Sequence, residues 1–542
     1  MTTGPTPDPS PSTTPYAGLG VREIVERQRH SAGPSASEIV AALLRRIGEV
    51  DRGGPALHSF AEGNADAPSV AVRADESRVA GRIGALHAVP VAVKDNLDTA
   101  DGTSTAAGST LLTGGSPAHD ATAVQRLRAA GAIVLGKTNM TVFDGARSRY
   151  SVSGWSPRGG LTLNPHALDR SPGGGSSGSA AAVSAGLVAA ALGTDTDGSL
   201  LCPAAFCGVV GVRPTWGLVS RAGMLPVAPS FDTVGVIART VADAAAVLTV
   251  IAGPDPRDPT TASAPSGIDY TAGCDGTGLV GARIGVAGSS FFGRSLGADV
   301  LADQAISLMS AAGANIIEDA DIPTARDIAE SDDQALVLLY ELRASLDAYL
   351  ASRPAGAPRS LTELVAAGTA AARVELPLFG QDIFEEALSI GGVDDPDYRA
   401  ALGRARRRSR DDGIDVVMAR QSLDVLVMPT YQPAYKTDLV NGDGSMAGAS
   451  HPAAIAGYPA VTVPIGLVAG LPVGLTFVSR SFTEPALLRL AHAFEQLASA
   501  YRTPAFRRPG IGSPIKRPTR IRSAVPVNKK RLEKQQISMK MR

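Results

Sequence analysis

The sequence predicts an α/β fold, in which short apolar strands alternate with longer amphipathic helices. Apolar, β-branched runs such as AVPVAV (88–93) and AIVLG (132–136) are typical of buried strands. Helical patterns separate them, such as TAVQRLRAAG (122–131), which ends at a glycine. Of the 542 residues, 44% are apolar and 19% are charged, so the chain has enough apolar residues to bury a large core.

The other elements continue this alternation. Ser35-Ala-Ser-Glu38 is a capping box that predicts the start of a helix with apolar residues on one face. The alanine-rich run SAAAVSAGLVAAAL (179–192) predicts a helix. VTVPIGL and LPVGLTFV, near 461–478, predict two strands joined by a short loop, and EPALLRLAHAFEQLA (484–498) predicts a closing amphipathic helix.

The domain organisation follows from shifts in composition. Residues 20–506 are expected to form one large domain. Residues 1–19 are rich in Pro, Ser and Thr and lack an apolar core, which indicates a disordered lead rather than a signal peptide. In residues 507–542, lysine and arginine outnumber acids twelve to one, which indicates a disordered basic tail. The charged helical segments near 280–420 are expected to form a subdomain that covers one face of the sheet and the substrate.

Charge and cysteine content narrow the class of protein. A net charge of −1 gives the main domain no electrostatic reason to bind nucleic acid, and we interpret the basic tail as a solvated segment. No uninterrupted apolar run reaches about 18 residues, so no membrane span is expected. Three cysteines are too few for a disulfide framework or a zinc site, which fits a cytoplasmic location. Nothing predicts a coiled coil, so a monomer is expected.

Two motifs superficially resemble nucleotide sites. Residues 131–138, GAIVLGKT, match the P-loop expression, but the first glycine follows a helix and the next four residues form a strand. The backbone amides that would bind phosphate would therefore be used in the sheet. Residues 173–178 match the dinucleotide fingerprint GxGxxG, but no strand precedes them. Neither motif predicts a nucleotide site.

Two segments rich in glycine and serine instead point to nucleophilic chemistry. SPGGGSSGSAAAVSAG (171–186) leads into a helix, and GTDTDGS (193–199) follows it. Small residues let backbone N–H groups converge on one point, as an oxyanion hole requires. A nucleophilic serine also needs a base, and none of the seven histidines lies in a glycine-rich elbow. Lys94 ends an apolar strand, where burial would lower its pKa and make it a base. A surface or salt-bridged role for Lys94 remains an alternative.

These segments resemble the amidase signature family. GGGSSGSAAAVSAG, ALGTDTDGS and CPAAFCGVVGVRPT are similar to its glycine-serine core, and PVAVKDNLDT is similar to its lysine segment. Similarity to the peptide amidase branch extends to SGWSPRGG (153–160), NPHALDRSP (164–172), GLVSRAGMLP (217–226) and AGYPAVTVPIG (456–466). The resemblance runs from about Ile24 to Phe506. It implies one α/β domain built on a twisted mixed β-sheet covered by helices on both faces.

The resemblance also implies a mechanism and a set of site residues. Ser199 is the expected nucleophile, and Lys94 is the base that receives its proton through a second serine with a cis peptide bond. Backbone N–H groups of Thr196, Asp197 and Gly198, together with that of Ser199, are expected to hold the oxyanion. The family uses no metal and no organic cofactor, so none is expected.

The chain departs from the family pattern at the position of this second serine, the bridging serine that passes the proton from the nucleophile to the lysine. An ungapped alignment from Asp169 to Ser199 places that serine at position 175, where this chain has Gly175. Glycine has no hydroxyl, and loss of a positioned proton-transfer group costs about 10²–10⁴ in rate. Ser176 and a water molecule are candidate substitutes. An inactivated variant, a homologue with a water relay and a member turned to another role all remain open.

The predicted function is therefore that of a serine amidohydrolase acting on a primary amide, with the C-terminal amide of a peptide as one candidate. Its expected partner is a small-molecule or short-peptide amide. Two alternatives use the same scaffold. One is an amide-forming acyltransferase, in which an amine replaces water, and the other is a ligand-binding homologue without catalysis.

Overall fold

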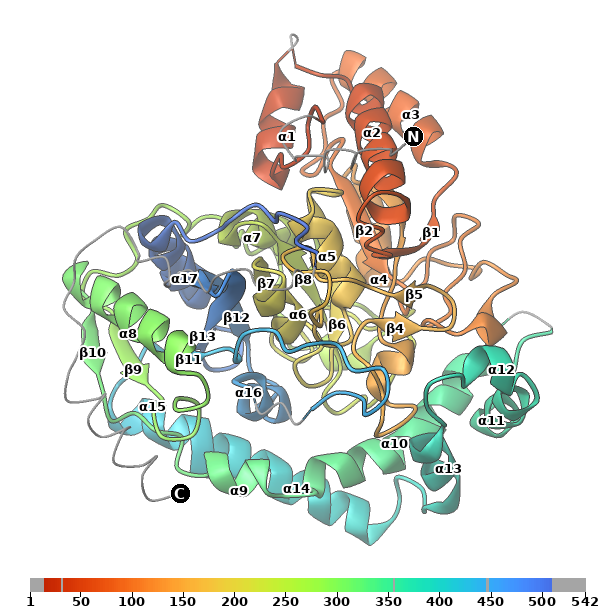
Figure 1. Cartoon of the computed structure of the whole chain (residues 1–542). Coiled ribbons are helices and arrows are strands. Elements are labelled where there is room, and N and C mark those ends of the chain that lie inside the picture. Colours follow the sequence, from red (N-terminus) through yellow and green to blue (C-terminus); the bar gives the residue numbers. More distant parts are fainter. Residues whose placement is uncertain (1–13, 31–32, 354–355, 445–447, 509–542) are drawn as a thin grey trace, which may run out of the picture.

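The computed structural model describes residues 14–30, 33–353, 356–444 and 448–508. Within them an eleven-stranded mixed sheet has the order β1-β3-β2-β6-β8-β7-β12-β13-β11-β9-β10 (Figure 1). Its strands are β1 (Phe60–Gly63), β2 (Pro90–Lys94), β3 (Ile133–Thr138), β6 (Ala190–Asp195), β7 (Val210–Arg213), β8 (Thr233–Ala238), β9 (Arg283–Val286), β10 (Asn315–Ile317), β11 (Val425–Pro429), β12 (Ala460–Val468) and β13 (Leu471–Val478). The short strands β4 (Trp155–Ser156) and β5 (Gly160–Leu161) pair separately.

Helices from the whole length of the chain surround this sheet. In chain order the α-helices are α1 (Val21–Arg29), α2 (Ala36–Arg46), α3 (Ala67–Val79), α4 (Thr122–Ala129), α5 (Ser177–Ser184), α6 (Leu201–Phe206), α7 (Val241–Ile251), α8 (Leu296–Ala311), α9 (Ala325–Ala329), α10 (Asp333–Leu350), α11 (Leu361–Ala370), α12 (Ala372–Glu375), α13 (Asp382–Ser389), α14 (Pro396–Ser409), α15 (Asp415–Arg420), α16 (Ser450–Ala456) and α17 (Glu484–Ala498).

Helices pack on both faces of the sheet, and β11 shows this most directly. Because successive side chains of a strand point to opposite faces, β11 contributes to two cores. Val425 and Val427 belong to the apolar core that includes α8 and α17. Leu426 and Met428 belong to a second core with α15 and α16. The prediction of one large domain with a mixed sheet covered on both faces is confirmed.

Strand directions place the second glycine-serine segment, 193–199, at the same edge of the sheet as Lys94. β2 runs parallel to both β3 and β6, with Val93 opposite Leu192. The carboxyl ends of β2 and β6 therefore lie at the same edge of the sheet, and they lead into Lys94 and the 193–199 segment. β8, β7, β12 and β13 continue the sheet in antiparallel pairs.

Most of the predicted elements are present. The apolar runs at 88–93 and 132–136 form β2 and β3, and the 122–131 segment forms α4. The capping box is made as expected: the Ser35 hydroxyl accepts from the Glu38 amide at 3.0 Å, and the Glu38 carboxylate accepts from the Ser35 amide at 2.7 Å. β12 and β13 form the predicted strand pair, and α17 spans 484–498.

The helix predicted over 179–192 is wrong in its second half. α5 ends at Ser184, and the chain turns at Gly186, which has φ +68°. Only glycine adopts this left-handed conformation at little cost. The following alanines enter β6, where they pair with β2 and β8. An alanine-rich run favours a helix when isolated, but here tertiary pairing determines its structure.

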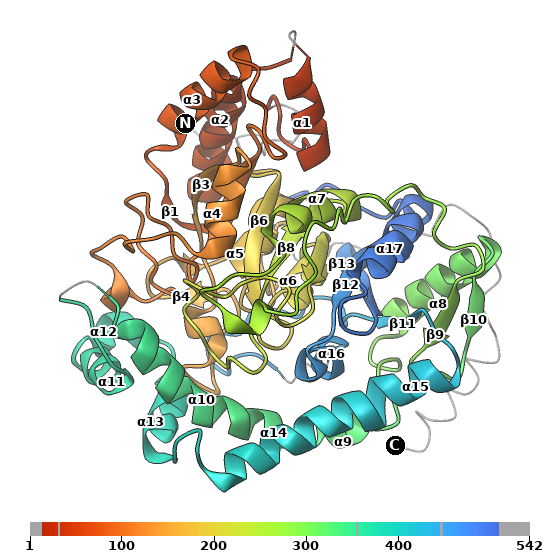
Figure 2. The same ribbon diagram turned by 180° about the vertical axis from the view of Figure 1, so that it is seen from behind.

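The region predicted as a cover over 280–420 divides into two parts. Its first part contributes β9 and β10 to the main sheet itself, so it is not a separate subdomain. The remainder, α9 to α15, forms an arc of helices along one side of the molecule (Figure 2). The lead over 1–19 is described only from residue 14, and the basic tail lies outside the described residues beyond 508.

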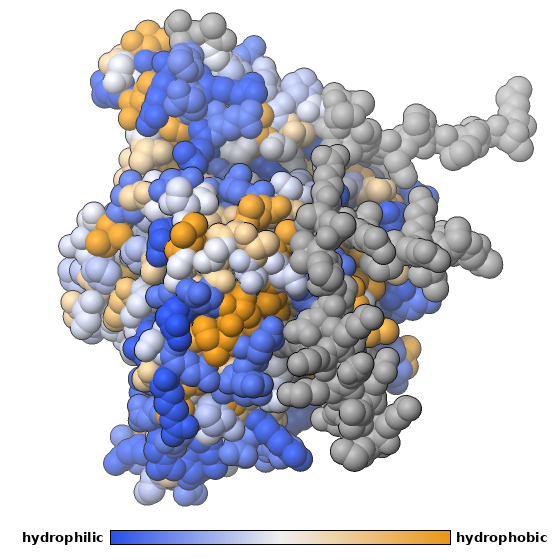
Figure 3. Space-filling model, turned by 90° about the vertical axis from the view of Figure 1, so that its left-hand side faces the viewer, coloured by the Kyte–Doolittle hydropathy of each residue, from blue (hydrophilic) through white to orange (hydrophobic). Residues whose placement is uncertain are grey.

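On the side of the molecule to the left in Figure 1, hydrophilic residues predominate around a hydrophobic area near the middle (Figure 3). Of the helices in the described ranges, none combines the length and apolar character needed to cross a bilayer.

Candidate active site

Lys94 is buried at the carboxyl end of β2, with none of its side chain exposed. Its Nζ donates to Thr194 Oγ1 at 2.7 Å and forms an ion pair with Asp144. Burial lowers the pKa of Lys94 from its ordinary value, although the charge of Asp144 opposes this shift. The sequence expectation of a buried lysine is confirmed. The alternative of a surface lysine is wrong, although Lys94 does form a salt bridge.

Asp144 is a site residue that the sequence analysis missed. It lies in the short turn η4 (Val142–Gly145), where Phe143 and Asp144 have φ of 48° and 55°. Such left-handed conformations are uncommon for residues other than glycine and concentrate at functional sites. Its Oδ2 accepts hydrogen bonds from Asn96 Nδ2 and Thr194 Oγ1, both at 3.2 Å. Burial raises the pKa of Asp144, and the charge of Lys94 opposes that shift.

Gly175 faces Asp144 and Ser199. An ideal Cβ at position 175 would overlap Asp144 Oδ1 and would stand 2.8 Å from Ser199 Oγ. The space that a serine side chain would need is therefore filled by the Asp144 carboxylate. No cis peptide bond is present among the described residues, so the peptide between Gly174 and Gly175 is trans.

Ser176, the candidate substitute relay, has its hydroxyl against β6. Its Oγ donates to the Thr194 carbonyl at 3.0 Å and accepts from the Thr194 N–H at 3.3 Å. Its own backbone N–H donates to the Ser199 carbonyl at 2.8 Å. The hydroxyl of Ser176 therefore helps to fix the strand, and the side chains that contact Lys94 Nζ are Asp144 and Thr194.

The nucleophile segment after β6 is held by a buried carboxylate. Asp195 accepts hydrogen bonds from the backbone N–H groups of Gly198, at 3.0 Å, and Leu200, at 2.7 Å. Arg213 forms an ion pair with Asp195, and neither side chain is exposed. Ser199, 8% exposed, lies between these two anchored amides.

One of the expected oxyanion donors needs correction. Because the Gly198 N–H is bonded to Asp195, it points into the turn, and the expectation that it holds the oxyanion is wrong. For the backbone N–H groups of Thr196, Asp197 and Ser199, the oxyanion role stays a prediction. The Thr196 side chain is itself fixed, because its hydroxyl donates to the buried carboxylate of Asp232 at 2.6 Å.

Gly198 is expected to tolerate no side chain. It has φ +81°, and an added Cβ would overlap the Tyr431 hydroxyl and stand 2.8 Å from Ser450 Oγ. Gly198→Ala should shift Ser199 and lower kcat/KM by about 10²-fold, because small displacements of a nucleophile are costly. Gly293→Ala is the matched control, since Gly293 has the same φ but no atom within 4 Å of its Cβ position. Equal activity of the two variants in a steady-state assay would contradict this prediction.

Asp197 connects the nucleophile segment to α16. Its carboxylate forms an ion pair with His451 and accepts from Ser450 Oγ at 3.0 Å. Burial disfavours the charged forms of both side chains, but the attraction between the His451 cation and the Asp197 carboxylate outweighs this effect. The pKa of His451 is therefore raised above 6.5, and the pKa of Asp197 is lowered below 3.8.

This pair predicts a pH-dependent step in stability. A raised histidine pKa gives stability that is complete below pH 6.5 and is lost as the pH rises through the pKa of the folded state. The lowered pKa of Asp197 acts at the acid end. Its contribution to stability is complete above pH 3.8 and is lost as the pH falls through the pKa of the folded state. The Tm of the wild-type protein should fall as the pH rises above 6.5, and His451→Gln should remove that step. His30→Gln is the control, since His30 is exposed beside Glu26. An unchanged step in His451→Gln would rule out this pair as its source.

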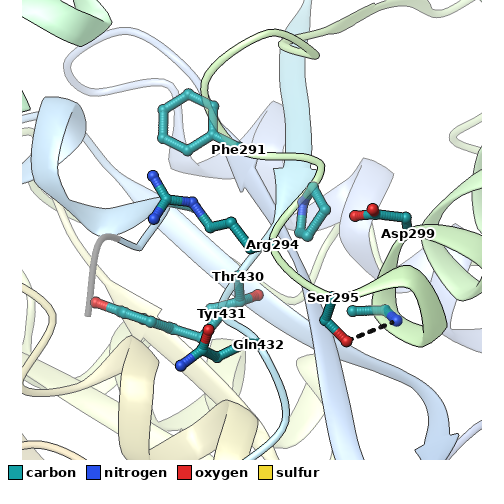
Figure 4. Close-up of a pocket in the computed structure, with 10 residues that line it drawn as sticks. Phe291, Arg294, Ser295, Asp299, Thr430, Tyr431 and Gln432 are labelled. Atoms are coloured by element: carbon teal, nitrogen blue, oxygen red, sulfur yellow. Dashed lines mark hydrogen bonds between the residues drawn. The ribbon is translucent and has the colours of Figure 1, made fainter. Parts of the chain in front are cut away.

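A small pocket lies next to the contact between Asp197 and α16. It is bounded by the loop before α8, the start of α8 and the segment after β11, with Phe291, Arg294, Ser295, Asp299, Tyr431 and Gln432 in its wall (Figure 4). The Tyr431 hydroxyl lies 2.8 Å from Ser450 Oγ, and Ser450 in turn contacts Asp197. The pocket is therefore linked to the nucleophile segment through Tyr431, although neither Lys94 nor Ser199 lines it.

Other residues of the site left little signal in the sequence. Asp144 and Thr194 contact Lys94, Asp195 and Arg213 fix the turn, and His451 pairs with Asp197. They come from β6, β7, α16 and η4. Thr194 and Asp195 lie in GTDTDGS and Arg213 lies in CPAAFCGVVGVRPT, whereas Asp144 and His451 lie outside the segments that the sequence analysis singled out. The glycine at position 175 was the one available clue to Asp144, because a missing side chain leaves space for another residue.

Comparison with known proteins places this arrangement in a family. The family model described as Amidase matches residues 38–488. The native peptide amidase from Stenotrophomonas maltophilia superposes with a TM-score of 0.86 and 43% identity, over 91% of this chain and 99% of that one. A probable amidase of Arabidopsis thaliana is 36% identical over 482 residues, 87% of this chain and 88% of its own length. A glutamyl-tRNA(Gln) amidotransferase component of a Synechococcus strain (WH7803) is 37% identical over 492 residues, 86% of this chain and 95% of its own length.

The match extends over most of the chain and includes both the strand that carries Lys94 and the segment that carries Ser199. The fold, with its eleven-stranded mixed sheet, agrees with that of the peptide amidase structure. The chain therefore belongs to the amidase signature family and is an amide-hydrolysing enzyme.

Proposed function

We propose that this enzyme hydrolyses a primary amide through an acyl-Ser199 intermediate, with the C-terminal amide of a short peptide as the first candidate substrate. The observation that supports this most is that Lys94 and the segment of Ser199 lie at the carboxyl ends of neighbouring strands, at one edge of the sheet. There the Asp144 carboxylate that pairs with Lys94 reaches the Cβ position of Gly175, which is 2.8 Å from Ser199 Oγ. The 43% identity to a peptide amidase supports the choice of substrate.

In the proposed reaction, Ser199 Oγ attacks the amide carbonyl while its proton moves toward Lys94. Backbone N–H groups of Thr196, Asp197 and Ser199 stabilise the oxyanion. The proton then passes to the leaving nitrogen, ammonia departs, and water hydrolyses the acyl-enzyme. Lys94 suits the role of base because burial lowers its pKa, which makes the neutral amine accessible.

Two measurements test the proposal together. Amidated dipeptides and small primary amides are incubated with the enzyme, and ammonia release is assayed. In parallel, the protein is treated with a fluorophosphonate, and the modified peptide is mapped by mass spectrometry. We expect ammonia release and a single adduct on Ser199. An adduct elsewhere, or turnover that persists in Lys94→Ala at the wild-type rate, would refute the assigned roles.

A second candidate is transfer of the acyl group to an amine. The similarity to a glutamyl-tRNA(Gln) amidotransferase component, over 95% of that protein's length, supports transfer as a second candidate function. The same acyl-Ser199 would then be intercepted by an amine in place of water. Hydroxylamine distinguishes the two functions, since a transferase forms a hydroxamate in preference to the free acid. Free acid as the main product would support the hydrolase.

We also infer that the enzyme works as a monomer in a reducing compartment, the cytoplasm. Cys202, Cys207 and Cys274 are all unpaired, and the first two are buried. Size-exclusion chromatography with light scattering tests the monomer, since a dimer would double the measured mass. Fractionation of cells that produce the protein tests the location.

A further inference from the structure

We propose that Asp144 replaces the missing bridging serine and carries the proton between Ser199 and Lys94. This inference rests on the proposed function of Ser199 and Lys94. Three observations about one small region support it: the contacts of the Asp144 carboxylate, the space left by Gly175, and the backbone that presents Asp144.

The carboxylate contacts the base directly. Asp144 Oδ1 pairs with Lys94 Nζ, and Oδ2 accepts from Asn96 and Thr194. These contacts come from β2, the turn that follows it and β6, so the carboxylate is fixed from two neighbouring strands. Its side chain is 4% exposed. A buried carboxylate oriented this firmly is positioned for a chemical role.

The carboxylate also reaches the space next to the nucleophile. The ideal Cβ position of residue 175 overlaps Asp144 Oδ1 and stands 2.8 Å from Ser199 Oγ. The space next to Ser199 Oγ that a serine side chain at position 175 would need therefore holds the carboxylate oxygen that pairs with Lys94. A carboxylate accepts a proton readily, and it can accept on one oxygen while the other remains hydrogen-bonded.

The backbone that presents Asp144 is strained. Phe143 and Asp144 are consecutive non-glycine residues with left-handed φ, a conformation that is energetically unfavourable for residues that carry a side chain. Phe143 packs edge-to-face against Phe384 of α13, and this contact supports the turn. A less strained turn would direct residue 144 elsewhere, so the strain serves to deliver the carboxylate to Lys94 and Ser199.

The proton balance of the relay closes. At rest the Lys94–Asp144 pair holds one transferable proton. As Ser199 Oγ bonds to the carbonyl carbon, its proton moves to Asp144 while the proton that the pair already shares settles on Lys94, so Lys94 is the final acceptor and the pair then holds two. When the C–N bond breaks, one proton passes to the leaving nitrogen, which departs as ammonia. Water repeats the sequence: it gives a proton to the pair as it attacks, and Ser199 recovers a proton as the acid leaves.

Four variants test the relay, with two readouts. Asp144→Asn and Asp144→Ala remove the proton acceptor and should lower kcat/KM by about 10²–10⁴-fold. Asp144→Ala combined with Gly175→Ser restores a hydroxyl where the carboxylate stood, and it should recover at least tenfold. Asp144→Ala combined with Gly175→Ala is the matched control, because it differs from the rescue only by that hydroxyl and should recover nothing. The second readout is the rate at which a fluorophosphonate modifies Ser199.

The pH profile separates a relay from a structural role. In the wild-type enzyme the serine proton moves first to a carboxylate, whereas in the rescued variant the neutral Lys94 amine is the only acceptor. Because an amine is more basic than a carboxylate, the acid limb of the profile of kcat/KM against pH should lie at higher pH in the rescued variant than in the wild type. If Asp144 had a purely structural role, Lys94 would be the only acceptor in both enzymes, and loss of the Asp144 charge, which raises the pKa of Lys94, would move this limb to lower pH instead.

The outcomes are distinguishable. If wild-type Ser199 does not react with the fluorophosphonate, the proposed function fails and the relay with it. If Ser199 reacts but Asp144→Asn reacts as fast as wild type, only the relay fails. Equal activity of the two double variants would also overturn the relay. If Asp144→Ala does not fold, as judged by its Tm, Asp144→Asn with its pH profile decides the matter.

Discussion

Ser199→Ala is expected to lower kcat/KM by a factor of about 10⁴ to 10⁶, because no other group can form the acyl-enzyme. The fold should tolerate the change. Ser199 is anchored through the neighbouring amides of Gly198 and Leu200, which donate to Asp195, and these bonds do not involve its hydroxyl. Ammonia release under substrate saturation measures the loss, and the Tm measures the fold. The fluorophosphonate adduct should disappear entirely.

Ser177→Ala is the matched control for this variant. Ser177 is buried in the same glycine-serine segment, and its hydroxyl has no hydrogen-bond partner within the described structure. Its removal should therefore leave both activity and Tm close to those of the wild type. If Ser199→Ala were no more damaging than Ser177→Ala, another residue would have to be the nucleophile.

Asp195→Ala is expected to destabilise the protein by about 3–5 kcal/mol, since it leaves the buried guanidinium of Arg213 without its counter-charge. Arg213 keeps only neutral acceptors, the backbone carbonyls of residue 195, at 3.0 Å, Phe231, at 2.7 Å, and Ala454, at 3.3 Å. The change also frees the amides of Gly198 and Leu200, so activity should fall with stability. Urea unfolding followed by circular dichroism gives the free energy of unfolding.

Glu330→Ala provides the comparison, because it breaks the exposed ion pair between Arg326 and Glu330 on α9 and its C-cap. Exposed pairs of this kind contribute about 0–1 kcal/mol. A loss in Asp195→Ala as small as that in Glu330→Ala would mean that Arg213 is accommodated without its partner.

The fold was predictable where local pattern and tertiary context agree. β2 and β3 are continuous apolar runs because both lie inside the sheet, and α17 has an apolar stripe because one side packs on β12 and β13. The alanine run after Ser179 was predicted wrongly because alanine favours a helix in isolation, whereas pairing with β2 and β8 determines the state of its second half.

The site was predictable only in part, for a different reason. Lys94 and Ser199 stand in recognisable segments, and the sheet brings the ends of those segments together. Asp144 lies in a turn whose conformation is set by packing around Phe143, and no spacing rule connects it to Lys94. The bond from Gly198 to Asp195 likewise depends on a turn closed by a side chain, which the glycine-rich pattern does not reveal.

The mutual exclusion of a side chain at position 175 and a carboxylate at position 144 has an evolutionary consequence. In this backbone, an acid cannot arise at 144 while a serine occupies 175, and a serine cannot return to 175 while the acid remains. The two positions must therefore covary among homologues, with glycine at 175 preceding the acid in any lineage. Descendants that acquired both residues are confined to their new chemistry, because each single reversion produces a clash or an enzyme without a relay.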